Sequence, residues 1–188
     1  PTGPSFATWR ERLDELLPLD LAASAAGRRA EDTRPVRYHP GLTLRYEWVG
    51  GRTRPYAGMD VPAHDRIVLG VPRSGVTRAF FRSRFQPLDA AQRARLQEEV
   101  QRQAQKRGLD AASTALAQDL SAGFSDRAAI EDIPGLGDDA VWELGQHGQT
   151  LHVLFNGSVI TIDVDLSDDA AMNKAIAVSL ANTIIGRL

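Results

Sequence analysis

The chain has 188 residues, of which 43% are hydrophobic and 24% charged, with no cysteine and a formal net charge of −2. This composition supports a core, and we expect a single α+β domain over residues 1–188. The lack of cysteine excludes disulfides, thiol catalysis and thiolate metal sites, and the near-neutral charge argues against a nucleic-acid binder.

Apolar residues at helical spacing open the chain. Ser5 is suited to cap a helix that ends at Pro18 and buries Phe6, Trp9, Leu13, Leu16 and Leu17. Residues 19–26 predict a second short helical turn, which stops at Gly27. The polar residues 28–40, which include two prolines, predict a loop.

A strand is predicted next from four large residues at alternate positions, Leu42, Leu44, Tyr46 and Trp48. We expect Gly50 and Gly51 to break it. Residues 52–65 contain two prolines and few large apolar side chains, which indicates a long loop or an irregular arm. A short apolar strand should follow over 67–71.

Two helices are predicted in the middle of the chain. Residues 87–107 carry a narrow apolar stripe among polar residues, and Gly108 follows, which indicates an exposed surface helix. Asp110 is suited to cap a second helix that runs to about residue 122.

The C-terminal third predicts a β-hairpin. Residues 133–142 contain two glycines, and we interpret them as a turn into a strand, since a phosphate-binding loop needs a Lys-Ser/Thr pair. Asn156-Gly157 favours a two-residue type I′ turn. That turn places six residues on one buried face, Leu151, Val153, Phe155, Ile160, Ile162 and Val164. The opposite face, Thr150 to Asp163, would be mostly compatible with solvent.

A final helix should follow, capped by Asp168 or Ser167. Its expected apolar face, which would cover the hairpin, consists of Met172, Ala175, Ile176, Leu180, Ile184 and Leu188. The chain shows no βαβ rhythm and no internal repeat. The predicted fold class is therefore α+β, an antiparallel sheet packed against helices.

Acidic residues gather where the hairpin meets this helix, at Asp163, Asp165, Asp168 and Asp169. Calcium prefers oxygen ligands, but the spacing does not match a calcium-binding EF-hand loop. The other interpretation is a solvated strand end followed by acids that favour the helix N-terminus. We expect no metal and no cofactor, with a cation at this cluster as the alternative.

The histidines do not indicate catalysis. His39, His64, His147 and His152 lack the spacing of a zinc site. We expect His152 on the outward face of the hairpin, forming an exposed pair with Asp163. No nucleophile motif accompanies these residues, so the sequence indicates that the protein is not an enzyme.

Basic and aromatic residues interleave over 45–56. The candidate binding residues are Arg45, Trp48, Arg52, Arg54 and Tyr56, because these residue types dominate the energetics of protein interfaces. Residues 52–65 also have too little apolar content to be explained by packing. Alternatively, such a mixture arises wherever a strand with aromatic core residues meets a polar loop.

The last third, from Pro134 to Leu188, resembles small bacterial extracytoplasmic lipoproteins of unknown function. In these, a Gly-Leu-Gly-Asp-x-Ala turn leads to two strands and a terminal amphipathic helix. The layout is also similar to the PsbP/Mog1-like α/β/α sandwich. This chain departs from the pattern by having no lipidated cysteine and by carrying the arginine-rich segment 87–107. The resemblance implies a location outside the cytoplasm, in the periplasm or anchored at the membrane by a lipidated residue upstream of Pro1, and it implies no catalytic residues.

From these observations we expect a non-enzymatic extracytoplasmic domain that binds a protein or another cell-envelope partner, and not nucleic acid, through residues 45–64. The alternative is a domain that binds a small molecule or a lipid in a cavity between the sheet and the C-terminal helix.

Overall fold

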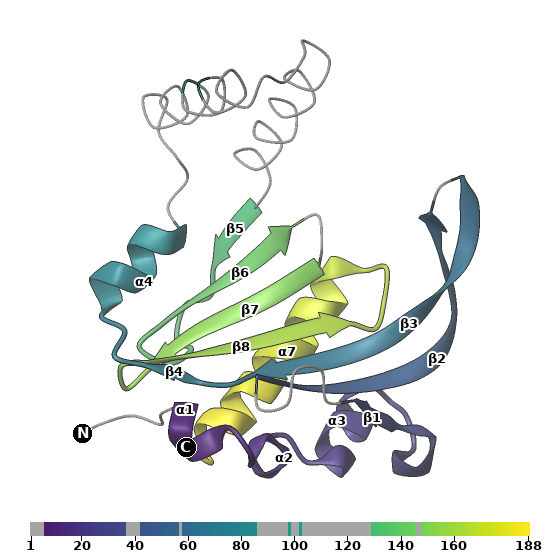
Figure 1. The fold of residues 1–188 in the computed structure, drawn as a ribbon, viewed down its shortest axis with the longest axis horizontal. Helices are drawn as coiled ribbons and strands as arrows, with labels where there is room; N and C mark the ends of the chain where they lie inside the picture. The colour runs from purple at the N-terminus through teal and green to yellow at the C-terminus, as the bar shows by residue number, and fades with distance from the viewer. Residues whose placement is uncertain are drawn as a thin grey trace.

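An antiparallel sheet of eight strands, with helices on both faces, forms the centre of the part of the chain that the computed structural model describes (Figure 1). The described residues are 6–36, 42–56, 58–85, 98, 102, 129–145 and 148–188. The predicted α+β class with an antiparallel sheet is confirmed. Apart from Glu98 and Arg102, the helices predicted over 87–107 and 110–122 lie outside the described residues, as do His39 and His147.

The N-terminal segment folds into short helices, α1 (Phe6–Trp9), α2 (Leu13–Leu16) and α3 (Leu19–Ala25), followed by the 3-10 turn η1 (Ala30–Asp32). The single helix predicted to end at Pro18 is wrong, because Arg12 leaves helical geometry with φ −127° and ψ 24° and separates α1 from α2. Trp9, Leu13, Leu16 and Leu17 are nevertheless buried, as the periodicity predicts.

The strands are β1 (Arg34–Val36), β2 (Thr43–Tyr56), β3 (Met59–Gly70), β4 (Arg73–Ser74), β5 (Ala129–Asp132), β6 (Asp139–Gly145), β7 (Gly148–Phe155) and β8 (Ser158–Asp165). Their order across the sheet is β1-β2-β3-β8-β7-β6-β5, with β4 paired to β8. Helix α4 (Arg78–Phe85) follows β4, and α7 (Ala170–Ile185) ends the fold. None of the helices in the described ranges is long and apolar enough to cross a membrane.

The hairpin predicted at Asn156-Gly157 is present. Both turn residues have positive φ, 48° and 72°, as a type I′ turn requires. Phe155 pairs with Ser158, and the rest of β7 and β8 follow in the predicted register. The six residues predicted for the inner face all belong to the main core, Phe155 at its margin. The predicted glycine turn before β6 is present too, with Gly135 and Gly137 at positive φ.

Helix α7 packs on this inner face, but through a different cap and a rotated surface. The N-cap is Asp169, not Asp168 or Ser167, and its Oδ1 accepts a hydrogen bond from Ala171 N at 2.9 Å. Met172 and Ala175, predicted to be buried, are exposed. Leu180 and Ile184 are buried as predicted, and Asn173, Ala177 and Ala181 are buried with them.

Asn173 explains the rotation of α7. Its Oδ1 accepts hydrogen bonds from the backbone N–H groups of Leu166 and Ser167, both at 3.1 Å, and its Nδ2 donates to Ser167 O at 2.8 Å. A buried amide with these partners satisfies the polar backbone of the turn between β8 and α7. Asn173 therefore occupies a buried position of α7, whereas the apolar pattern predicted that Met172 would be buried.

The segment between Gly50 and Asp65 departs most from its prediction. Strand β2 does not break at the glycines but continues through a register shift between Val49 and Thr53. Strand β1 pairs with β2 only as far as Glu47, and β8 pairs with β3 only from Arg66 onward. Residues 49–65, which lie between these points, therefore form a two-stranded arm that curves away from the sheet (Figure 1). Its two prolines fit this position, since few ladder hydrogen bonds are lost where no further strand follows among the described residues.

The face of the sheet opposite α7 is also partly covered. Phe81 and Phe85 of α4 pack against Val141 and Leu154 in a second, smaller core. The prediction of a mostly solvent-compatible outer face is therefore wrong for β7, where His152 is 7% and Leu154 2% exposed.

Candidate functional site

The arm is joined to the rest of the fold by ion pairs centred on Arg52. Its Nε donates to Asp65 Oδ1 at 2.8 Å, and its Nη2 donates to Asp165 Oδ1 at 3.0 Å and to Asp165 O at 2.9 Å. Its Nη1 donates to Asp168 Oδ1 at 3.1 Å, and Arg28 donates to Asp65 Oδ2 at 2.9 Å. These five residues, the Arg52 cluster, connect the arm to the segment after α3 and to the turn between β8 and α7.

Asp65 is the buried centre of the Arg52 cluster and is 3% exposed. A buried carboxylate is costly unless it is paired and hydrogen-bonded, and both of its oxygens meet an arginine. Burial opposes the charge on Arg52, but hydrogen bonds to the three aspartates raise its pKa further above the ordinary value. A Cβ at position 50 would lie 2.8 Å from Asp65 Oδ1, so the cluster also depends on Gly50.

Three of the five predicted binding residues have largely buried side chains: Arg52, Trp48 and Arg45. Trp48 is 3% exposed, and its Nε1 donates to Thr33 Oγ1 at 2.9 Å. Arg45 forms an ion pair with Glu47, and both side chains are largely buried. The structure therefore places the side chains of Trp48 and Arg45 within the fold, on the part of β2 that precedes the arm.

The other two predicted binding residues, Arg54 and Tyr56, lie on the arm itself. In the register of the hairpin, Arg54 is opposite Val61 and Tyr56 is opposite Met59. Their backbones are part of β2, and their side chains lie outside the described part of the structure.

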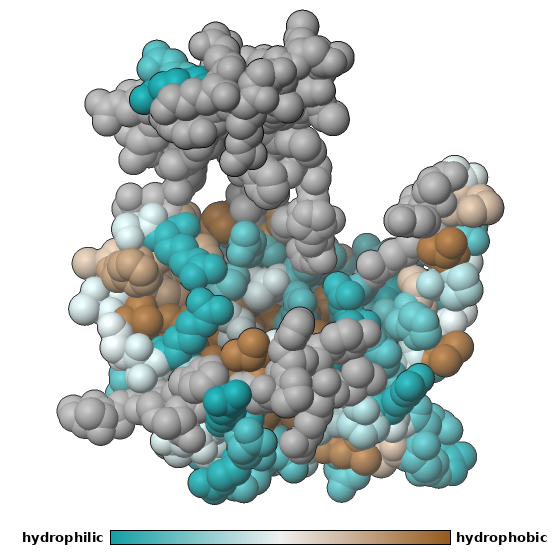
Figure 2. Space-filling view, viewed as in Figure 1, coloured by the Kyte–Doolittle hydropathy of each residue, from teal (hydrophilic) through white to brown (hydrophobic). Residues whose placement is uncertain are grey.

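Exposed apolar residues of the arm were missed by the sequence prediction. Val49 is 85% and Met59 64% exposed. Hydrophobic residues stand out along the arm among hydrophilic neighbours in Figure 2. A signal for the strand existed, because Met59, Val61 and Ala63 continue the alternation of the apolar strand that follows.

The acidic residues predicted to cluster do not converge. Asp165 and Asp168 belong to the Arg52 cluster, whereas Asp169 caps α7. Asp163 lies two residues before Asp165 on the same face of β8, but its side chain accepts a hydrogen bond from Thr150 Oγ1 at 2.9 Å, and burial raises its pKa. Among the described residues no group of three or more acids or histidines is placed to hold a metal ion.

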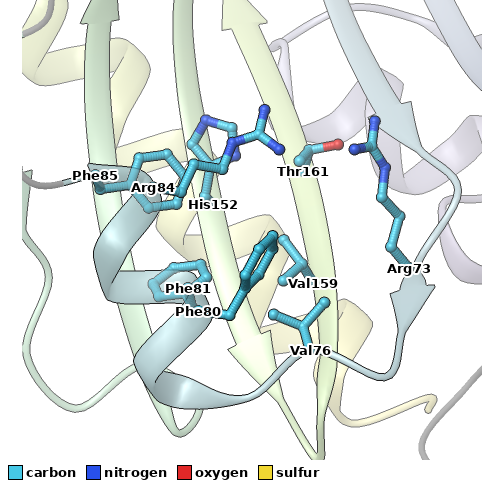
Figure 3. Close-up of a pocket in the computed structure, with 9 residues that line it drawn as sticks. All are labelled: Arg73, Val76, Phe80, Phe81, Arg84, Phe85, His152, Val159 and Thr161. Atoms are coloured by element: carbon cyan, nitrogen blue, oxygen red, sulfur yellow. The ribbon is translucent and has the colours of Figure 1, made fainter.

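A pocket opens between α4 and the sheet, on the face opposite α7 (Figure 3). Its volume is about 470 Å³, including space open to solvent. The residues that line it are Arg73, Val76, Phe80, Phe81, Arg84, Phe85, His152, Val159 and Thr161. The cavity predicted as an alternative lay between the sheet and the C-terminal helix, whereas this pocket lies on the other face of the sheet.

One wall of the pocket is formed by neighbouring rings that are tilted against one another. The ring of Phe85 lies 4.6 Å from that of His152 and 5.0 Å from that of Phe81, measured between centroids. His152 Nε2 is 2.8 Å from Glu143 Oε2, so the predicted exposed pair with Asp163 is wrong. Burial lowers the pKa of His152; Glu143 acts in the opposite direction and the nearby arginines add to the lowering.

Helix α4 is fixed to the sheet by a second ion cluster. Asp139 at the start of β6 accepts hydrogen bonds from Arg78 at 2.9 Å and from Arg82, which also pairs with Asp132. Burial acts to raise the pKa of Asp139, but hydrogen bonds from Arg82 and Arg78 hold it below the ordinary value. The position of α4, and with it the pocket, is therefore defined by charge as well as by packing.

The described residues offer charge and apolar surface more than reactive groups. His152 is the residue best suited to acid–base chemistry, and no hydroxyl in the described ranges hydrogen-bonds to its ring. No family model, curated protein or solved structure matches the chain.

Proposed function

We propose that this protein is a non-enzymatic binding domain that engages a protein partner through its arm, residues 49–65. The observation that supports this most is the projection of a two-stranded hairpin that leaves Val49 and Met59 85% and 64% exposed. Soluble proteins usually avoid apolar residues on exposed edge strands, because these promote association. A partner that covers them accounts for both the projection and its composition.

The arm is set in position before a partner arrives. The Arg52 cluster fixes its base, and Trp48 anchors the neighbouring part of β2 in the core. Preorganisation of this kind lowers the entropic cost of binding. In this proposal Arg52 and Trp48 support the arm, and the contacts are made further along it, where Arg54 and Tyr56 also lie.

Side chains, rather than strand edges, would make the contact. Pro55 on β2 and Pro62 on β3 lack an N–H group, so each edge of the arm is interrupted as a template for an added strand. The partner we propose is therefore a folded protein surface with an apolar patch that receives Met59 or Val49.

The location we propose is outside the cytoplasm, as a periplasmic or membrane-anchored lipoprotein domain with a PsbP/Mog1-like sandwich. Its support is the resemblance of residues 134–188 to such proteins. Fractionation of cells that express the natural gene, followed by immunodetection, tests the location. Recovery in the envelope or periplasmic fraction would agree with the proposal, and recovery with cytosolic markers would contradict it.

The two methionines of the chain provide a matched test of the binding role. Met59 lies on the arm and is 64% exposed, while Met172 lies in the first turn of α7 and is 52% exposed. Both can become aspartate without loss of core packing. Immobilised wild-type protein, Met59→Asp and Met172→Asp would each be incubated with an envelope extract of the host.

We expect wild type and Met172→Asp to retain the same protein in near-stoichiometric amount, and Met59→Asp to retain at least ten-fold less. Equal melting temperatures for the variants would show that the loss is not due to unfolding. Equal retention by the two variants, or no protein retained by wild type, would refute the binding role of the arm.

A further inference from the structure

Two arginines face the pocket beside α4, and neither has an acidic partner in the part of the chain that the structure describes. Arg73 on β4 and Arg84 on α4 extend from opposite sides toward the side chain of Thr161 on β8 (Figure 3). Neither forms an ion pair with another residue in the described ranges, whereas the arginines of the Arg52 cluster are paired. Two uncompensated guanidinium groups beside a pocket attract anions and can bind a carboxylate by charge-assisted hydrogen bonds.

The rest of the pocket is apolar and largely aromatic. Phe80, Phe81 and Phe85 all come from α4, and Val76 and Val159 complete the lining. Phe80 is 63% exposed although it borders the pocket. The guanidinium carbon of Arg84 lies 5.8 Å from the ring centroid of Phe85. The positive charge of Arg84 is therefore at the edge of the aromatic wall.

Charge and apolar surface therefore meet within one small concavity. The space of about 470 Å³ includes open solvent, so its enclosed part suits only a small ligand. A ligand that matches it needs an anionic group at one end and a flat apolar body at the other. A hydroxyl donor, Thr161, lies between the two arginines to orient the anion.

We infer that this pocket binds a small aromatic carboxylic acid, whose carboxylate is held by Arg73, Arg84 and Thr161 and whose ring lies against the phenylalanines of α4. The site lies on α4, β4, β7 and β8, and not on the arm. It is independent of the proposed function, and either can fail without the other.

Phenylacetate is the probe we choose, because it combines one ring with one carboxylate. Its matched controls are phenylacetamide, which keeps the shape without the charge, and acetate, which keeps the charge without the ring. Titration of the full chain would be followed by NMR chemical shifts at low ionic strength. We expect phenylacetate to bind at least ten-fold more tightly than either control.

Variants of exposed residues locate the site. Arg73→Ala and Arg84→Ala should each weaken phenylacetate binding at least five-fold, and Phe80→Ala should weaken it as well. Arg34→Ala, at an exposed arginine on β1, the strand at the far edge of the sheet, should have no effect. The inference is overturned if phenylacetate fails to bind at 10 mM (roughly the weakest useful affinity for so small a ligand), if phenylacetamide binds equally well, or if the pocket arginine variants behave like Arg34→Ala.

Discussion

Replacement of Arg52 by alanine should destabilise the fold more than replacement of any exposed arginine. The change removes the partner of Asp65 Oδ1 at 2.8 Å and the partner of Asp165 Oδ1 at 3.0 Å. Asp65 is 3% exposed and keeps only Arg28. Loss of one partner from a buried ion pair costs about 3–5 kcal/mol, and because Arg28 remains we expect the low end of that range, about 3 kcal/mol.

The free energy of unfolding can be measured by urea titration at pH 7, with tryptophan fluorescence as the signal. Arg12→Ala is the control, since Arg12 pairs with Glu15 on the exposed surface and its guanidinium carbon lies 5.1 Å from the Trp9 ring centroid, contacts that together should contribute much less to stability than the buried pairs of Arg52. Arg52→Lys should fall between wild type and Arg52→Ala, because an ammonium cannot span the carboxylates that the guanidinium joins. A stability for Arg52→Ala equal to that of Arg12→Ala would refute the role of the Arg52 cluster.

Three further changes test the packing and the buried charges. Gly50→Ala places a Cβ 2.8 Å from Asp65 Oδ1, and should lower the free energy of unfolding in urea by about 1–3 kcal/mol; an unchanged value would contradict the close approach. Burial raises the pKa of Asp163 above 3.8, so protonated Asp163 favours the folded state at low pH. This contribution is lost as pH rises through the folded-state pKa. Asp163→Asn should therefore raise the melting temperature more at pH 7 than at pH 3.5, and equal shifts at both pH values would be inconsistent with a raised pKa. Burial lowers the pKa of His152 below 6.5, so protonation of the unfolded chain should destabilise wild type between pH 7 and pH 5, and His152→Gln should show a smaller drop in melting temperature over that interval. An identical drop would exclude His152 as the cause.

Local signals predict part of this fold well. The Asn156-Gly157 turn depends on two residues that tolerate positive φ, so the sequence alone determines the register of β7 and β8. Helix α7 was predicted at the correct place but rotated, because Asn173 serves the backbone of a turn that periodicity does not reveal. No helix was predicted over residues 78–85. The burial of His152 beneath α4 was therefore not predicted either.

The candidate site was harder to predict, because the same residue types support folds and interfaces. Arg52 and Trp48 resemble interface residues in sequence, yet their partners are distant along the chain, as Asp165 illustrates. Only the tertiary fold shows that these side chains are already paired. The exposed position of Met59 was missed as well, because the alternation of Met59, Val61 and Ala63 was not interpreted as part of a strand.

Photo-crosslinking through methionine tests most directly whether the arm contacts a partner. The chain contains two methionines, so photo-methionine incorporated in the host reports from Met59 in a Met172→Leu variant and from Met172 in a Met59→Leu variant. Any initiator methionine contributes equally to both variants. We predict a discrete crosslinked complex with another protein from Met59 and none from Met172. Equal crosslinking from the two positions, or none from Met59, would contradict the proposal that the arm is the binding surface.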